Sequence, residues 1–120
     1  MPLTRDFRDT VKARADRDPA FRAGLVQEAL QAIVDGDLPA ARILLRDAIN
    51  ATTGFKQLGE LLGIGEKSLM RMYGPKGNPR ADNLLATVAR LREAARISVE
   101  VKASHAPERK PGRARTAAAA

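Results

Sequence analysis

Hydrophobic residues in the stretch 54–80 recur at helical spacing on both sides of a short glycine-containing break. This spacing predicts two short helices, with the apolar positions along the seam where the helices would cross. The positions on that seam are Leu58, Leu62, Ile64, Leu69 and Met72. We therefore predict a helical hairpin closed by a tight turn, the arrangement of a helix-turn-helix.

Three residues account for the predicted turn. Gly59 has no side chain and so allows the second helix to approach closely, although a glycine inside a helix costs about 1 kcal/mol relative to alanine. Gly63 stands where the first helix must stop, and glycine adopts the left-handed conformation that ends a helix without steric penalty. Ile64 then fills the corner between the two helices.

The second helix of the hairpin carries cations on its outer face. A helical projection of residues 66–73 places Lys67 and Arg71 one turn apart. The opposite face carries the hydrophobic positions Leu69, Met72 and Tyr73. Like charges at this spacing weaken an isolated helix by about 0.2–0.5 kcal/mol unless an anion binds them, and a DNA duplex supplies such an anion.

The chemistry of this face favours a major groove. The Arg71 guanidinium has the fork of donors that matches O6 and N7 of guanine, while Lys67 and Ser68 suit phosphate oxygens or base edges. Met70 borders the face and is suited to contact a thymine methyl. The DNA-binding candidates are Gln57, Glu66, Lys67, Ser68, Met70, Arg71, Lys76, Asn78 and Arg80. The alternative interpretation is a solvated basic face on an ordinary helical hairpin.

Glycines and prolines predict that residues 73–80 form a loop after the second helix. Lys76, Asn78 and Arg80 in this loop are suited to contact phosphates, which would position the protein without reading sequence. The sequence supports equally a loop whose charges are simply solvated.

Further helices are predicted before the hairpin. Phe7 and Val11 lie one turn apart in a charged segment and indicate a short amphipathic helix. Asp18 and Pro19 suit the N-cap and first position of a second helix, which ends at Gly36. Its expected inward face consists of Phe21, Leu25, Ala29, Ile33 and Val34.

Asp37 predicts the N-cap of the next helix. The inward residues expected there are Ala41, Leu44, Leu45, Ala48 and Ile49. Residues 35–37 form an Asp-Gly-Asp cluster, but two carboxylates without further oxygen ligands fall short of a calcium site. We therefore interpret the cluster as a helix stop followed by a cap.

After the hairpin, residues 82–95 predict one more helix, with Asp82 in the first turn, where a negative charge is favourable. Its expected core residues are Leu84, Leu85, Val88 and Leu91. Residues 97–101 then alternate apolar and polar side chains, which predicts a half-buried strand. A single strand leaves its backbone unpaired, so we expect it to pair with a second subunit or with a sheet edge of a partner.

Composition agrees with a helical nucleic-acid-binding protein. The 120 residues suffice for one domain, and three phenylalanines with one tyrosine imply an aliphatic, alanine-rich core. The net charge is +7, and residues 1–102, with 17 basic and 13 acidic groups, account for +4 of it. Residues 103–120 are rich in proline, arginine and alanine, which predicts a disordered basic tail that either strengthens DNA binding or keeps the chain soluble.

Other function classes find little support. The chain has no cysteine, which fits a cytoplasmic protein, and no apolar run approaches the ~18 residues of a membrane span. The single histidine, His105, lies at the start of the tail, where we expect neither a catalytic nor a metal site. Residues 63–68 superficially resemble a phosphate-binding loop, but Glu66 precedes the lysine and a helix precedes the segment. We expect no enzyme activity, no cofactor and no membrane partner.

Over residues 38–101 the chain resembles the Cro/C1-type helix-turn-helix, and most closely the HigA-like addiction-module antidote proteins, the antitoxins of RelE/ParE-type toxin–antitoxin pairs. The resemblance is carried by Gln57, Leu58, Leu62, Gly63, Ile64, Lys67, Ser68, Leu69, Arg71, Gly77, Asn78, Pro79, Asp82, Leu84 and Leu85. In that family the Gly-Asn-Pro triplet follows the recognition helix at the spacing found here. Two positions depart from the family: Gly65 replaces a serine or threonine N-cap, and Gly59 replaces a common alanine.

The sequence thus predicts an all-α fold: a bundle of five to six helices containing a Cro/C1-like helix-turn-helix, a short C-terminal strand and a disordered tail. We divide it into a helical extension (1–36), a helix-turn-helix core with the strand (37–102) and the tail (103–120). The resemblance implies a cytoplasmic homodimer that binds operator double-stranded DNA, represses its own operon and neutralises a RelE/ParE-like toxin. The alternatives are a stand-alone phage- or plasmid-type repressor and a helical protein-binding adaptor that does not bind DNA.

Overall fold

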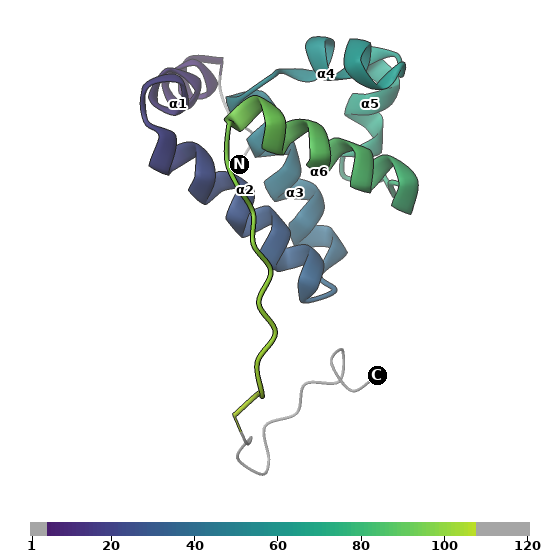
Figure 1. The fold of residues 1–120 in the computed structure, drawn as a ribbon. Coiled ribbons are helices and arrows are strands. Elements are labelled where there is room, and N and C mark those ends of the chain that lie inside the picture. Colours follow the sequence, from purple (N-terminus) through teal and green to yellow (C-terminus); the bar gives the residue numbers. More distant parts are fainter. Residues whose placement is uncertain (1–4, 108–120) are drawn as a thin grey trace.

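The computed structural model describes residues 5–107, and every regular element in that range is a helix (Figure 1). The six helices are α1 (Arg5–Arg17), α2 (Pro19–Val34), α3 (Leu38–Ala51), α4 (Phe55–Leu62), α5 (Glu66–Met72) and α6 (Ala81–Ala95). The all-α prediction is confirmed. None of the helices among these residues has the length and hydrophobicity needed to cross a lipid bilayer.

Helices α2 and α3 form an antiparallel pair whose boundaries follow local chemistry. The Asp18 carboxylate accepts a hydrogen bond from the Phe21 amide at 3.2 Å, which caps the N-terminus of α2. Gly36 takes a positive φ of 75° after α2, and Asp37 accepts a hydrogen bond from the Ala40 amide at 3.2 Å. Residues 35–37 therefore serve as the predicted stop and cap.

The core lies where α3 meets α2, α4, α5 and α6. Its fully buried side chains come from all five of these helices and from the C-cap of α5, and they are largely aliphatic, as the scarcity of aromatic residues predicts. The buried cluster consists of Ala29, Leu45, Ala48, Ile49, Phe55, Leu58, Leu69, Tyr73 and Leu91. Burial of these apolar surfaces stabilises the arrangement of the short helices α4 and α5, which are marginal on their own.

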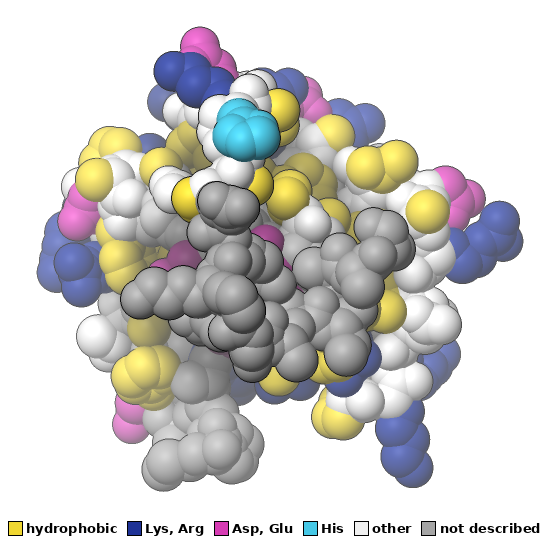
Figure 2. All heavy atoms as spheres, turned by 90° about the horizontal axis from the view of Figure 1, so that it is seen from below, with side chains coloured by type: hydrophobic (Ala, Val, Ile, Leu, Met, Phe, Trp, Pro, Cys, Tyr) yellow, Lys and Arg dark blue, Asp and Glu magenta, His cyan; other side chains and the backbone are white. Residues whose placement is uncertain are grey.

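Two residues predicted to face the core are exposed. Val34, at the last position of α2, is 74% exposed, and Leu85 on α6 is 69% exposed. The other predicted core residues of α6, Leu84, Val88 and Leu91, do lie at the core, so α6 is rotated such that only Leu85 of this set points outward. Figure 2 shows the face seen from below, where hydrophobic side chains are exposed and most Lys and Arg side chains lie towards the edge.

The predicted C-terminal strand is absent from the described residues. Residues 97–107 follow α6 as an extended segment without ladder hydrogen bonds, because a strand needs a neighbouring strand and the regular elements among the described residues are all helices. The predicted disordered tail, residues 103–120, lies outside the described residues from position 108 onward.

Arg22 on α2 connects the end of the preceding helix α1 with the end of α6, which is remote in sequence. Its Nη1 donates to the carbonyl oxygen of Ala15 at 2.6 Å and to that of Asp16 at 3.3 Å, at the C-terminal end of α1. Its Nε donates to the carbonyl oxygen of Ala95, the last residue of α6, at 3.2 Å. A cation at two helix C-termini satisfies carbonyls that lack intrahelical partners and complements both helix dipoles.

Candidate nucleic-acid interface

Helices α4 and α5 are joined by the three-residue turn 63–65, and two glycines in the turn and one inside α4 have distinct roles. Gly63 ends α4 with φ 70° and ψ 30°, the left-handed conformation predicted for it. A Cβ built on Gly59 would lie 2.6 Å from the carbonyl oxygen of Ile64, so only glycine permits this close approach. Gly65 occupies the N-cap position of α5 without a side-chain hydrogen bond.

The seam between these helices is the one predicted. Leu58 and Leu69 are fully buried, and Leu62, Ile64 and Met72 pack partly buried against the same cluster. Since the hydrophobic side of α5 is buried in this seam, the remaining residues of α5 face away from the core.

The outer face of α5 presents the predicted cations to solvent. All nine DNA-binding candidates are exposed, including Lys67, Ser68, Met70 and Arg71 on α5. Arg71 Nη2 donates to Ser68 Oγ at 3.3 Å, which places the guanidinium over the first turn of the helix. Among residues 5–107, no carboxylate forms an ion pair with Lys67 or Arg71, so their charges are uncompensated.

The orientation of α5 is held from its C-terminal end by a buried polar pair. Tyr73, the C-cap of α5, is almost fully buried, and its hydroxyl donates to Thr87 Oγ1 on α6 at 2.8 Å. Thr87 in turn donates to the carbonyl oxygen of Asn83 at 2.8 Å. Burial raises the pKa of Tyr73 above its ordinary value, while the hydrogen bond with Thr87 acts in the opposite direction.

The loop from α5 to α6 is packed tightly under the end of α5. A Cβ on Gly77 would overlap the carbonyl oxygens of Arg71 and Met72, so the loop requires glycine there. Arg42 on α3 donates from Nη1 to the carbonyl oxygen of Gly77 at 3.1 Å. This anchor holds the loop that carries the exposed candidates Lys76 and Asn78.

The last loop candidate differs from its neighbours. Arg80 occupies the N-cap position of α6, and its Nε lies 3.5 Å from Asp82 Oδ1. Both side chains are largely exposed, so this ion pair is weak and leaves Arg80 available to a phosphate group.

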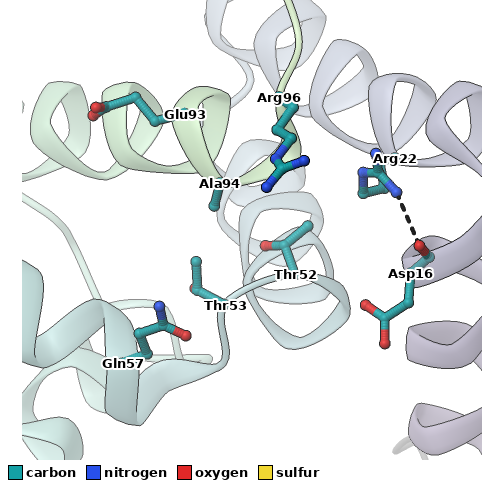
Figure 3. A pocket seen from close by; sticks show the side chains of 8 residues that line it. All are labelled: Asp16, Arg22, Thr52, Thr53, Gln57, Glu93, Ala94 and Arg96. Atoms are coloured by element: carbon teal, nitrogen blue, oxygen red, sulfur yellow. Dashed lines mark hydrogen bonds between the residues drawn. The ribbon is translucent and has the colours of Figure 1, made fainter.

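Glu66 lies in the first turn of α5, whereas Gln57 on α4 lines a polar cavity of about 490 Å³. Figure 3 shows Gln57 on one side of this cavity and Arg22 with Asp16 on the other, with Arg96 between them. The cavity lies where the C-terminal ends of α1 and α6 approach the start of α4. Gln57 therefore stands apart from the cations of α5, at the opposite end of the hairpin.

A second, smaller cavity of about 200 Å³ lies between α1, α2 and α3. Its lining is mainly apolar and includes Phe7, Val11 and Phe21, together with the carboxylate of Asp47. Burial raises the pKa of Asp47, and the neighbouring charge of Arg46 lowers it by less. Within the described part of the chain, no group of three His, Cys, Asp or Glu side chains is placed to hold a metal ion.

Sequence reasoning missed the residues that support the interface from a distance. Arg42 contacts a loop 35 positions away, and Arg22 contacts α6 73 positions away. Of the supporting residues, only Thr87 could have been recognised in the sequence. It stands among the apolar positions of α6, and a buried hydroxyl needs a hydrogen-bond partner. The two arginines carried no such signal, because arginine on a helix is usually solvated.

Comparison of the chain with models of known protein families, with curated proteins and with solved structures gives no match.

Proposed function

We propose that this chain is a sequence-specific double-stranded-DNA-binding protein in which α4 and α5 act as a Cro/C1-like helix-turn-helix. One observation carries the proposal: Lys67, Ser68 and Arg71 share the exposed face of α5, with no compensating carboxylate among the described residues. An uncompensated pair of cations one turn apart is favourable only beside an anion. A duplex offers phosphates and guanine edges to these donors together.

The roles within this surface differ by position. Arg71 and Ser68 lie on the helix that would enter the major groove, so they are assigned to base reading, with Lys67 reaching either bases or phosphate. Lys76, Asn78 and Arg80 lie on the loop and the N-cap of α6 and are assigned to phosphate contacts. Glu66 and Met70 flank the reading residues on α5, whereas Gln57 lies on α4 and is assigned no contact beside them.

Affinity for DNA upstream of the gene, compared with shuffled DNA of the same composition, tests this assignment. Arg71→Ala should weaken binding to the upstream DNA by about 1–3 kcal/mol and reduce the preference for it over shuffled DNA. Arg17→Ala, on the exposed surface of α1, removes the same charge elsewhere and should retain that preference. Equal losses on both DNA molecules for Arg71→Ala would show that Arg71 does not read bases.

The biological role proposed for this DNA binding is that of an antitoxin. The resemblance to HigA-like antidotes supports a cytoplasmic homodimer that represses its own operon and neutralises a RelE/ParE-like toxin. Co-expression with the adjacent small open reading frame tests this role separately from DNA binding. Growth rescue and a co-purifying complex are expected; an inert neighbouring product would leave a stand-alone repressor.

A further inference from the structure

The segment after α6 is extended but has no hydrogen-bonded neighbour. Arg96 ends α6 in the left-handed conformation with φ 56°, and the Ile97 amide donates to the carbonyl oxygen of Arg92 at 3.2 Å. Beyond that bond, no backbone group from position 98 to 107 takes part in a hydrogen bond. Figure 1 shows this segment running away from α4 and α5. Its donors and acceptors are thus available to a second strand without blocking the face of α5.

The side chains along the segment have the two-residue period of a strand. Ile97 is half-buried, Val99 is 39% exposed and Val101 is 86% exposed. The alternate positions are polar and exposed, and they are Ser98, Glu100, Lys102 and Ser104. An extended segment with exposed valines and an unpaired backbone is a template for strand pairing.

We propose that residues 98–104 pair antiparallel with the same residues of a second copy of this chain, centred on Val101. In this register Val101 faces Val101 of the second copy, and Val99 faces Ala103. On the other side of the ribbon, Glu100 faces Lys102 of the second copy, and the two-fold symmetry repeats that pair. The ends of the ribbon place Ser98 opposite Ser104.

Neighbouring registers are less favourable because of their charges. Centring the pairing on Glu100 opposes two carboxylates, and centring it on Lys102 opposes two cations. Slipping one strand by one residue places Val101 opposite Glu100 or Lys102 of the second copy. Each face of the ribbon would then combine apolar with charged side chains. Centring on Val99 opposes Arg96 to Lys102. The register on Val101 alone matches apolar with apolar and positive with negative positions over the whole segment.

This pairing is expected to be weak in the free protein, because a two-stranded ribbon is marginal in water. Two copies held on adjacent DNA half-sites would raise the effective concentration of one segment near the other. The pairing nevertheless does not depend on DNA binding, so it is tested without DNA.

Disulfide trapping tests the register directly, since the chain contains no cysteine. Directly opposed residues in an antiparallel pair have Cα atoms about 4.5–5.5 Å apart, within the range of a disulfide. Val101→Cys should therefore form a covalent dimer under mild oxidation. A mixture of Ser98→Cys and Ser104→Cys proteins should form a heterodimer more readily than either protein couples to itself, because identical serines lie about 20 Å apart.

A charge exchange supplies the second readout. In the Val101→Cys background, Glu100→Lys should lower the cross-linking yield several-fold, and Glu100→Lys with Lys102→Glu should restore it. Absence of a Val101→Cys dimer would overturn the proposal and favour a sheet edge of a different protein as the partner. Self-coupling of Ser98→Cys and Ser104→Cys as efficient as their mixed coupling would also overturn it, since that result indicates unspecific collisions.

Discussion

The buried hydroxyl of Tyr73 donates to Oγ1 of Thr87 at 2.8 Å and so connects the end of α5 to the middle of α6. Both side chains are excluded from solvent, so the Tyr73 hydroxyl depends on Thr87 for its partner, while the Thr87 hydroxyl also donates to the carbonyl oxygen of Asn83. Because Tyr73 directly follows the helix with Lys67 and Arg71, this bond orients the proposed reading face relative to the core.

Substitutions at this pair should be strongly coupled. Thr87→Val leaves the Tyr73 hydroxyl buried without an acceptor and should lower the free energy of unfolding by about 1–3 kcal/mol. Tyr73→Phe leaves Thr87 still donating to Asn83, so its cost should be smaller, about 0.5–1.5 kcal/mol. The double variant should lose less than the sum of the single losses in urea denaturation; strictly additive losses would mean that the two hydroxyls do not stabilise each other.

Two helical glycines should respond oppositely to alanine. Gly59→Ala forces a Cβ against the Ile64 carbonyl oxygen and should cost about 1–3 kcal/mol, as overpacking does. Gly24→Ala in α2, where nothing lies within 4 Å of the added Cβ, should stabilise the protein by about 0.5–1 kcal/mol. Thermal unfolding of both variants checks this, and a stabilising Gly59→Ala would contradict the tight turn between α4 and α5.

Loss of the Arg22 side chain should loosen α1 and α6 together. Arg22→Gln removes a charged donor from the carbonyls of Ala15, Asp16 and Ala95, and should lower the free energy of unfolding by about 1.5–3 kcal/mol. Arg17→Gln on the exposed side of α1 removes the same charge and should change stability by less than about 0.5 kcal/mol. Hydrogen exchange should accelerate at the ends of both helices in Arg22→Gln; acceleration in α1 alone would place Arg22 outside the contact with α6.

Asp47 should make stability decrease as pH rises. Burial raises its pKa in the folded state above the unfolded value, so the free energy of unfolding falls as pH increases from the unfolded pKa through the folded pKa. Asp47→Asn should therefore stabilise the protein at pH 7, by up to about 0.5 kcal/mol for a partly exposed site, and have less effect near pH 3. Urea denaturation at both pH values measures this, with the exposed Asp9→Asn as control. A destabilised Asp47→Asn protein at pH 7 would mean that the carboxylate has a favourable partner.

Lys76 should behave differently from Arg71 in DNA binding. Lys76 on the loop is assigned to a phosphate contact. Lys76→Ala should therefore weaken binding to upstream and shuffled DNA equally, and should reduce the slope of log affinity against log salt concentration by about 1. Anisotropy titrations over a range of salt concentrations measure both effects. Loss of preference between the two DNA molecules would assign Lys76 to base reading instead.

Local signals in the sequence predicted the all-α fold and the exposed positions of Lys67, Ser68 and Arg71. Asp18, Asp37 and Gly63 act within four residues of their own positions, so their roles follow from the chain alone. Leu85 shows the limit of this reasoning, because helical spacing defines an apolar stripe but not how far the helix turns about its axis when it packs. The prediction of a strand over residues 97–101 was wrong for a related reason. Alternation of apolar and polar residues indicates an extended segment, whereas the hydrogen bonds of a sheet also need a second strand.

What the sequence determined by itself is the set of helices, the seam between α4 and α5, and the identity of the cations on the outer face. Helix formation, capping and periodicity are local properties, which act between residues at most a turn or so apart. Only the tertiary structure decided that Arg22 and Arg42 would bind distant carbonyls and that Tyr73 would meet Thr87. Those contacts depend on the angle and distance at which packed helices cross, which no single stretch of the chain encodes.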